Sequence, residues 1–283
     1  MPILFPGVAE SLNIRLLSAG CIKVDTWWTE TDRLREFWRL YLNDEDGAAL
    51  RIRDEIHPMP AGRLVLVPAG LDFEVQLKAP IEQFFVQFEF VGWPSGAALE
   101  VVPRPVALAP HPDRDALARS LAAEVQTAHE LEPILASRLK ALAHLVTAAV
   151  LRDVPEDRAR SFMRIAEGQQ ELLAVLQFID KHLDETLAND RLAEIAGASE
   201  SRFIRRFRDA TGRTPGRYVQ DRRVRRAAEL LVSTGQTIDQ IADSCGFANR
   251  YYFTRVFTQR MGCPPARYRS DRPFMRAEQP ESD

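Results

Sequence analysis

An internal repeat in the C-terminal third constrains this chain more than any other feature of its sequence. Shifted by 50 positions, residues 201–222 align with residues 251–272, and nine of the 22 aligned positions are identical. Composition alone would supply roughly one or two matches. The identical pairs are Phe203/Phe253, Arg205/Arg255, Phe207/Phe257, Gly212/Gly262, Pro215/Pro265, Arg217/Arg267, Tyr218/Tyr268, Asp221/Asp271 and Arg222/Arg272. The fold must therefore contain two copies of one supersecondary unit.

Each copy has the pattern of a helix-turn-helix. Upstream of the repeat, residues 192–197 (LAEIAG) match residues 241–246 (IADSCG), so each copy consists of a short helix, a glycine-containing turn and a longer helix. Glycines 212 and 262 are placed to end the longer helices, and prolines 215 and 265 to begin the next ones. We expect helices at about 169–185, 190–197, 200–211, 215–232, 238–244, 249–260 and 265–270. Residues 168–276 are thus predicted to be an all-helical double helix-turn-helix domain.

The longer helix of each unit divides into an inner and an outer face. At about 100° per residue, Phe203 and Phe207 share the inner face, whereas Arg205 points away from it. Phe253, Phe257 and Arg255 occupy the same positions in the second copy. An outward arginine in a helix-turn-helix suits base reading or phosphate contact in a major groove. A solvated surface arginine is the alternative for either helix alone, but the repetition favours nucleic acid.

The distribution of charge agrees with a nucleic-acid partner but does not establish one. Residues 171–276 hold 19 Lys and Arg against 13 Asp and Glu, whereas residues 1–170 hold 18 against 24. Charge runs are most often solvated helix faces, so the positions of the arginines matter more than their number. The predicted connecting helix 215–232 carries four candidates for contacts with the DNA backbone or for salt bridges with Asp221 and Glu229. They are Arg222, Arg223, Arg225 and Arg226.

These residues resemble a known family. The runs LAEIAGASESRFIRRFRDATGRTPGRYV, RRAAELL and TIDQIADSCGFANRYYFTRVFTQRMGCPPARYR, within residues 190–269, are similar to the paired helix-turn-helix domain of the AraC/XylS family of bacterial transcription regulators. The resemblance implies double-stranded DNA as the partner, bound through two successive major grooves, and RNA polymerase as a second partner if the protein is an activator. The DNA-facing positions that it implies are Ser201, Arg202, Ile204, Arg205, Arg250, Tyr251, Thr254 and Arg255. Ala248 stands at the usual N-cap position of the second recognition helix, so we expect Asn249 to cap it instead.

The first hundred residues predict a β domain. Short runs rich in aromatic and branched residues are separated by Gly, Pro, Asn and Asp, which indicates a sandwich or a small barrel. The runs are 22–28, 36–42, 49–56, 63–68, 72–77 and 82–91. Members of the resembled family with a long N-terminal part usually carry a cupin-like barrel followed by dimerisation helices. We therefore expect a cupin-like regulatory β domain over 1–112, including a turn and strand at 60–68 (PAGRLVLVP) similar to those of such barrels.

Beyond a proline-rich bridge at 102–112, the apolar residues change to a helical period. Helices are expected at 113–130 and 132–152, as a hairpin that packs on the barrel or between two copies of the protein. Their apolar stripe predicts a homodimer, and we assign residues 113–167 to dimerisation helices and linker. The stripe consists of Ile134, Leu135, Leu139, Leu142, Leu145 and Val146. The whole chain is thus predicted to be an α+β multidomain protein, with a disordered tail at 277–283.

An effector site is plausible in the β domain. Aromatic rings beside hydrogen-bond donors form the mixture that binds sugars or aromatic acids. The candidate effector-binding residues are Trp27, Trp28, Trp38, Arg39 and Tyr41, with Phe37 and Asn43 nearby. The alternative for each aromatic residue is a place in the barrel core. The sequence does not identify the ligand, and it does not establish that a ligand binds.

Catalysis is not expected. The five histidines are isolated from one another, whereas a metal-dependent cupin enzyme needs clustered ligands, so we expect no metal and no other cofactor. Cys21, Cys245 and Cys263 are scattered and are expected to be buried, reduced thiols. No uninterrupted apolar run of about 18 residues and no signal-like start occur, so we expect a cytoplasmic protein without membrane contact.

The prediction is therefore a DNA-binding transcription regulator, an activator, controlled by a small molecule bound in the N-terminal barrel. One alternative is a ligand-independent regulator whose barrel serves only assembly. A second is a cupin-type enzyme with a basic helical appendage.

Overall fold

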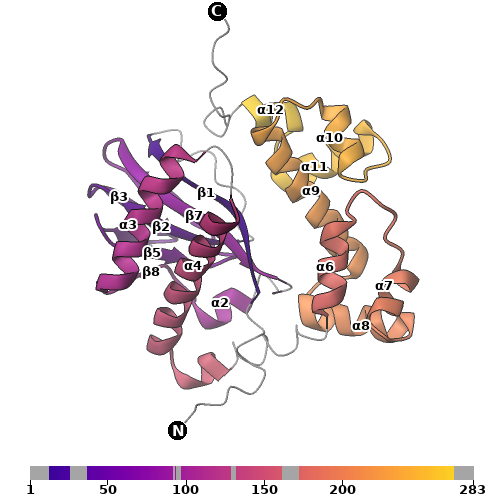
Figure 1. The fold of residues 1–283 in the computed structure, drawn as a ribbon, viewed down its shortest axis with the longest axis horizontal. Helices are drawn as coiled ribbons and strands as arrows, with labels where there is room; N and C mark the ends of the chain where they lie inside the picture. The colour runs from indigo at the N-terminus through magenta and orange to yellow at the C-terminus, as the bar shows by residue number, and fades with distance from the viewer. Residues whose placement is uncertain are drawn as a thin grey trace, which may run out of the picture. The chain divides into compact units, whose positions relative to one another are not determined.

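The computed structural model describes residues 13–25, 37–91, 93, 97–128, 132–160 and 172–270. The chain divides into two compact units, Met1–Gln170 and Glu171–Asp283. The first unit contains all the described strands, and the described secondary structure of the second consists of helices joined by turns and loops. The fold is thus α+β, with the β-sheets in the N-terminal part and helices in the C-terminal part (Figure 1). The tail at 277–283, predicted to be disordered, lies outside the described residues.

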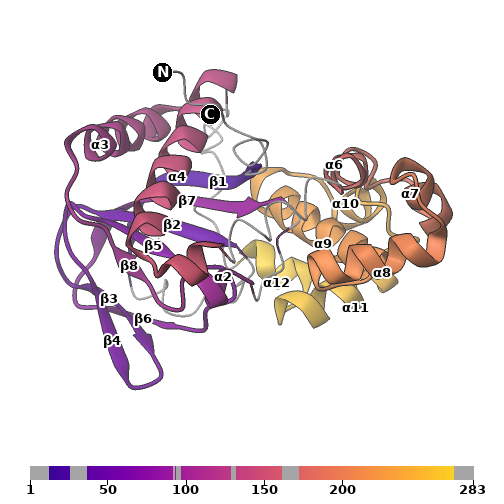
Figure 2. The same ribbon diagram turned by 90° about the horizontal axis from the view of Figure 1, so that it is seen from below.

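Two antiparallel sheets form the N-terminal unit. The larger sheet has the order β1–β7–β2–β5–β8 and the smaller one the order β4–β3–β6. The strands of the larger sheet are β1 (Ile14–Val24), β7 (Ile81–Phe90), β2 (Trp38–Asn43), β5 (Leu64–Val67) and β8 (Val106–Ala107), and those of the smaller are β4 (Glu55–Met59), β3 (Ala48–Ile52) and β6 (Glu74–Leu77). Figure 2 shows β3 and β4 extending as a hairpin beside the larger sheet. The cupin-like barrel itself remains a prediction.

Two differences from the predicted strands have local causes. The run 49–56 is broken into β3 and β4, because Arg53 has a left-handed φ of 54° and turns the chain back on itself. β1 begins at Ile14, well before the predicted 22–28, and pairs with β7 from Ile14↔Phe90 to Val24↔Ile81. Gly20 interrupts the branched pattern of β1 because a Cβ there would meet the Phe85 ring at 3.0 Å.

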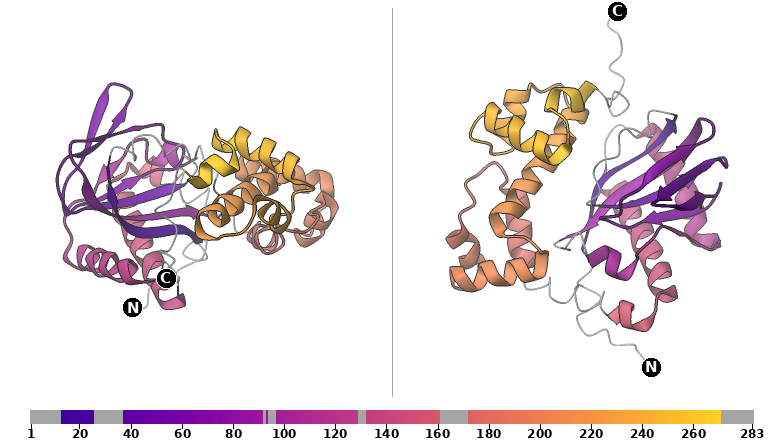
Figure 3. Two further views of the ribbon diagram at one scale, coloured as in Figure 1. Left: turned by 90° about the horizontal axis from the view of Figure 1, so that it is seen from above. Right: turned by 180° about the vertical axis from the view of Figure 1, so that it is seen from behind.

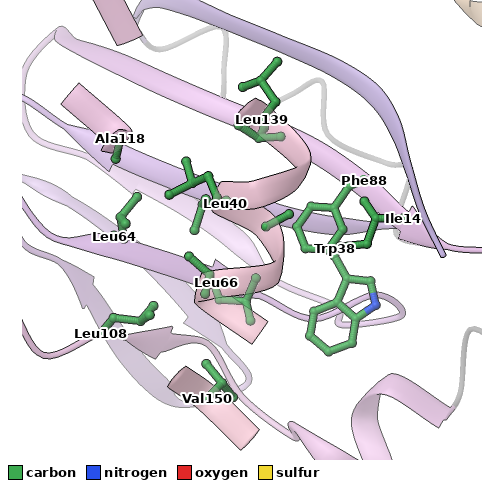
Figure 4. Close-up of a cluster of buried hydrophobic side chains, with 14 of the residues drawn as sticks. Ile14, Trp38, Leu40, Leu64, Leu66, Phe88, Leu108, Ala118, Leu139 and Val150 are labelled. Carbon is green, nitrogen blue, oxygen red and sulfur yellow. The ribbon is translucent and has the colours of Figure 1, made fainter. Parts of the chain in front are cut away.

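The core of the N-terminal unit lies between one face of the larger sheet and two helices, α3 (Pro112–Thr127) and α4 (Pro133–Asp153). Both helices contact β1 as well as each other (Figure 1). Figure 4 shows Trp38, Leu40 and Phe88 of the sheet with Leu139 and Val150 of α4 in one buried cluster. The short helix α2 (Ala97–Val101) adds Ala98 and Val101 to it.

This packing corrects the prediction for the apolar stripe of α4. Leu135, Leu139, Leu142 and Val146 are at most 5% exposed and belong to the core of their own unit. Only the flank of the predicted stripe stays outside, with Ile134 at 71% and Leu145 at 47% exposure. The four leucine and valine residues therefore cannot be a subunit interface, because the sheet already covers them. α4 is apolar and long enough to span a bilayer by composition, with a mean hydropathy of 1.5, but its apolar side packs on the sheet.

The helices of the C-terminal unit follow the predicted pattern closely. They are α6 (Leu173–Lys181), α7 (Asn189–Ile195), α8 (Glu200–Thr211), α9 (Pro215–Ser233), α10 (Ile238–Ser244), α11 (Arg250–Met261) and α12 (Pro265–Ser270). α9 packs against α8 and also against α10, α11 and α12. Figures 1 and 3 show α6 to α8 gathered at one end of α9 and α10 to α12 at the other. The two helix-turn-helix units therefore share one long connecting helix.

Because this unit has its own buried core, we predict that a fragment of residues 168–276 folds alone. Its circular dichroism should be helical, and it should unfold cooperatively on heating. Within it, Phe207→Ala or Phe257→Ala should each cost about 3–5 kcal/mol, because both side chains are fully buried. Tyr251→Ala is the control and should change stability little, since that ring is 87% exposed. A fragment without cooperative unfolding would contradict the assignment.

Candidate nucleic-acid interface

The two helix-turn-helix units have the same internal packing. In the first, the Phe203 and Phe207 rings lie 5.4 Å apart, and Phe207 lies 5.4 Å from Tyr218 of α9. In the second, the equivalent distances are 5.4 Å for Phe253 to Phe257 and 5.3 Å for Phe257 to Tyr268. All four pairs are edge-to-face, the arrangement that aromatic rings favour. The inner faces predicted from the sequence are confirmed, and both recognition helices α8 and α11 are held in the same way.

The capping geometry confirms the predicted ends of α8 and α11 and the predicted start of α10. Gly212 and Gly262 end α8 and α11 in the left-handed conformation, with φ of 71° and 75°. Thr237 and Gln240 form the capping box of α10. Asn249 caps α11 as predicted, because its Oδ1 accepts a hydrogen bond of 2.8 Å from the backbone N–H of Tyr252. Ser199 occupies the N-cap position of α8, but its side chain forms no capping hydrogen bond.

In the turn between α10 and α11, the backbone at Gly246 lies very close to the backbone of Leu183. Gly246 has a φ of 71°, and a Cβ there would stand 2.3 Å from the carbonyl oxygen of Leu183. Arg223 of α9 lies at the same place, donating hydrogen bonds to the carbonyl oxygens of Leu183 and Glu185. Only glycine fits here, so the turn of the second unit is packed against the loop that precedes α7 of the first unit.

The outer faces of α8 and α11 carry the predicted DNA-facing residues. Ile204 and Thr254 are half-buried at the edge of that face, and the other six are exposed. The exposed six are Ser201, Arg202, Arg205, Arg250, Tyr251 and Arg255. Arg205 and Arg255 point to solvent at equivalent positions of the repeat. Both units thus present a guanidinium group that a nucleic acid could reach; their contact with DNA stays a prediction.

The second recognition helix carries two interactions that the sequence did not indicate. The Arg250 guanidinium lies 3.0 Å from the carboxylate of Asp239 on α10. The Arg255 guanidinium lies over the Tyr252 ring, 5.3 Å from its centre. Tyr252 aligns with Arg202 of the first copy, which is a predicted DNA-facing residue. The alignment could therefore have indicated that Tyr252 lies near the DNA-facing surface of the second unit. In the structure its hydroxyl accepts a hydrogen bond from Gln220 of α9.

Several arginines of α9 are structural, which narrows the list of candidate backbone contacts. Arg222 is buried and lies 2.8 Å from Asp180 of α6. Arg223 binds the two carbonyl oxygens of the preceding loop, and burial lowers the pKa of its guanidinium. Arg226 pairs with Glu229 at 3.2 Å, as one predicted alternative allowed. Because these groups already bind the protein, the exposed arginines of α8 and α11 are the better candidates for contacts with DNA.

Of the predicted effector residues that the structure describes, Trp38 lies on one face of the larger sheet and Arg39 and Tyr41 on the other. Trp27 and Trp28 lie outside the described residues. Trp38 points into the core beside α4, stacked with Phe88, which is the core position that the sequence left open as the alternative; its role at an effector site stays a prediction. Arg39 and Tyr41 point to the opposite face of the sheet, because successive residues of a strand alternate in direction.

That opposite face is buried and mixes polar side chains with aromatic and branched ones. Arg39 is fully buried, with its guanidinium 4.2 Å from the centre of the Phe37 ring and 5.3 Å from that of Phe73. Four residues along β2, Asn43 accepts a hydrogen bond from Gln83 and donates one to the carbonyl oxygen of Met59. A cavity of about 690 Å³ lies elsewhere in the unit, lined mainly by residues 101–107 and by residues at and just after the end of α4; Trp38, Arg39 and Tyr41 do not line it.

Two further features bear on chemistry. Within the described ranges, no group of three or more His, Cys, Asp or Glu residues is placed to hold a metal ion. Cys245 is buried, and desolvation raises the pKa of its thiol to about 11, which makes it a poor nucleophile. Cys21 and Cys263 are partly exposed rather than buried as predicted.

Comparison with known proteins agrees with this geometry. A family model described as a helix-turn-helix domain matches residues 192–271. The chain is 35% identical over 101 residues to the regulatory protein SoxS of Salmonella typhimurium. The aligned residues make up 36% of this chain and 94% of SoxS. The chain belongs to the AraC/XylS family of transcription regulators.

Other relatives extend the comparison. The MmsAB operon regulatory protein of Pseudomonas aeruginosa is 31% identical over 105 residues, or 37% of this chain and 34% of that protein. The chain spans between 34% and 58% of the length of four curated relatives that it matches. The crystal structure of ToxT from Vibrio cholerae matches 93% of this chain and 97% of its own, with a TM-score of 0.52 and 12% identity. This last likeness shows that the fold of ToxT resembles that of both units.

The equivalent arginines give the first test of the interface. If Arg205 and Arg255 read bases, Arg205→Ala and Arg255→Ala should each cost about 1–3 kcal/mol on the cognate site. Each variant should also relax the preference only at its own half of that site. Arg226→Ala is the matched control, because its guanidinium is bound to Glu229, and should change binding little. Equal losses on specific and random duplexes, measured by fluorescence anisotropy, would show phosphate contact alone.

Proposed function

We propose that this family member is a sequence-specific regulator that inserts α8 and α11 into two successive major grooves of double-stranded DNA. One observation carries the proposal: two recognition helices, held by the same aromatic packing, present an exposed arginine at the same position. The side chains around Arg205 and Arg255 include a hydroxyl and an exposed aromatic ring, in Ser201 and Tyr251, which suit contacts with bases.

The connecting helix supports binding to one face of the duplex. α9 has 19 residues, and at 1.5 Å per residue it is about 28 Å long. Successive major grooves on one face of B-DNA lie about 34 Å apart. A helix of this length, with one unit packed at each end, is therefore of the right size to separate two recognition helices by one helical turn.

Selection from a random pool of double-stranded DNA by the full chain tests the proposed function. We expect enrichment of a site with two sequence blocks, centred about one helical turn apart. Footprinting on the region upstream of the chain's own gene then identifies a natural operator. Failure to enrich any sequence, at a salt concentration where random DNA is bound, would refute sequence-specific recognition.

For the N-terminal unit we propose the role of a sensor, with an aromatic acid as the favoured effector. The support is the surroundings of Arg39, whose guanidinium lies 4.2 Å and 5.3 Å from the centres of the Phe37 and Phe73 rings, a combination that suits both a carboxylate and a flat apolar group. A ligand-independent regulator is the alternative, and the cupin-type enzyme gains no support from the MmsAB operon regulatory protein or from SoxS, both of which are named as regulatory proteins. We further propose that the protein acts in the cytoplasm, as an activator that contacts RNA polymerase.

Calorimetric titration with sugars and aromatic acids tests the sensor. We expect an aromatic acid to bind, and Arg39→Met to weaken that binding at least about tenfold, since a charge-assisted hydrogen bond would be lost. Arg51→Met is the control, because Arg51 pairs with Glu74 on the exposed smaller sheet. Absence of binding by every acid and sugar, with DNA binding intact, would favour the ligand-independent alternative.

We also propose that the exposed flank of α4 joins two copies in a symmetric dimer. Ile134, Ala141 and Leu145 lie on this flank at helical spacing and are all exposed. The double variant Ile134→Glu, Leu145→Glu should be monomeric by light scattering and should unfold at nearly the wild-type temperature. Arg119→Glu on the exposed side of α3 changes the net charge by the same amount and should leave the dimer intact. A double variant that stays dimeric would exclude this flank.

A further inference from the structure

A buried polar network joins the two helix-turn-helix units through α9. Its centre is Asp221, whose side chain is 7% exposed. One carboxylate oxygen, Oδ2, lies 2.6 Å from Arg213, in the turn that follows α8. The other, Oδ1, lies 3.2 Å from Arg260 on α11. A single carboxylate of the connecting helix thus binds one arginine from each unit.

The network continues to the DNA-facing surface of the second unit. Arg260 also donates a hydrogen bond of 3.0 Å to the Oε1 atom of Gln220. The amide nitrogen of Gln220 donates a hydrogen bond of 2.9 Å to the hydroxyl of Tyr252. The ring of Tyr252 lies under the guanidinium of Arg255, which is the predicted base-reading residue. Contacts therefore run without a break from the end of α8 to the outer face of α11.

Because this network is buried, it is stable in only one orientation of the two helix-turn-helix units about α9. Apolar packing alone tolerates small sliding movements, whereas a buried carboxylate between two guanidinium groups is stable only when both ion pairs are in place. Arg213 is fixed to its own unit, because the Thr211 hydroxyl donates a hydrogen bond to the Arg213 carbonyl oxygen. Rotation of one unit about α9 would separate Asp221 from one of its partners. The ion pairs thus resist changes in the angle between α8 and α11.

We propose that Asp221, with Gln220 as its extension, is a positioning residue that sets the spacing between the two half-sites the protein reads. This inference rests on the proposed function, since it assumes that α8 and α11 occupy two grooves. Inserting two base pairs between half-sites moves the second by about 7 Å and rotates it by about 70° around the duplex. A rigid pair of units cannot follow this displacement, whereas a pair released from the network can.

The test uses the full chain and duplexes derived from the DNA that the wild-type protein selects. Four probes are compared by fluorescence anisotropy: the selected site, the same site with two base pairs inserted between its halves, and each half-site alone. The wild-type protein should prefer the selected spacing at least about tenfold, because binding of the second unit gains from a high effective concentration only when the geometry fits. Asp221→Asn should reduce this preference to less than about threefold, while half-site affinity stays within about twofold of wild type.

A second variant keeps the test decisive if Asp221→Asn does not fold. Gln220→Met keeps the length of the side chain but removes the link between Arg260 and Tyr252, and should lower the spacing preference in the same direction. Glu229→Gln is the control, because Glu229 forms an exposed ion pair with Arg226 on the same helix and should keep the wild-type preference. Circular dichroism and thermal melting establish the folded fraction of each variant.

The outcomes separate this inference from the proposed function. Unchanged spacing preference in both variants, or an equal loss on all four probes, would overturn the positioning role and leave the regulator intact. A wild-type protein that selects no DNA would overturn both.

Discussion

The edge-to-face contact between a recognition-helix phenylalanine and the tyrosine of the next helix is the interaction on which the C-terminal unit depends. It occurs twice, as Phe207 with Tyr218 and as Phe257 with Tyr268, at nearly the same distance. Each contact fixes the rotation of a recognition helix about its own axis. Because the rotation is fixed, the residues two positions before each phenylalanine, Arg205 and Arg255, must point outward.

The arginines of this unit fall into two groups with different tasks. Arg213, Arg222, Arg223 and Arg260 are bound to carboxylates or carbonyl oxygens inside the unit. Their burial is stable only because each charge meets a partner. Arg202 and Arg205 have no ion pair within the described part of the chain and lie on the outer face of α8. The net charge of residues 171–276 counts both groups alike. It therefore overstates the positive charge that the surface of the unit offers to a nucleic acid.

The N-terminal unit shows a comparable division between the two faces of its larger sheet. One face carries Trp38 and Leu40 into the core under α4, and the other carries Arg39 and Tyr41 into a buried region that also holds Phe37 and Phe73. The period of two along β2 makes these neighbours face opposite ways. A ligand site and a helix-packing surface can therefore coexist on one strand, and any effector bound near Arg39 lies one sheet thickness from the helices that pack on the core.

The sequence by itself determined the repeat, the bounds of α8, α10 and α12, and the inward and outward faces of both recognition helices. These features depend on local chemistry, namely helical periodicity, glycine C-caps such as Gly212, and the Thr237 capping box, all of which act over a few residues. Tertiary structure alone decided the partners of the α9 arginines, the burial of Leu139 and the separation of Trp38 from Arg39. An amphipathic stripe indicates that a helix surface will be buried. It does not indicate whether a sheet of the same chain or a second copy of the chain covers that surface. An arginine likewise forms its ion pair with whichever carboxylate the fold brings near, and Asp180 and Arg222 are 42 residues apart in the chain.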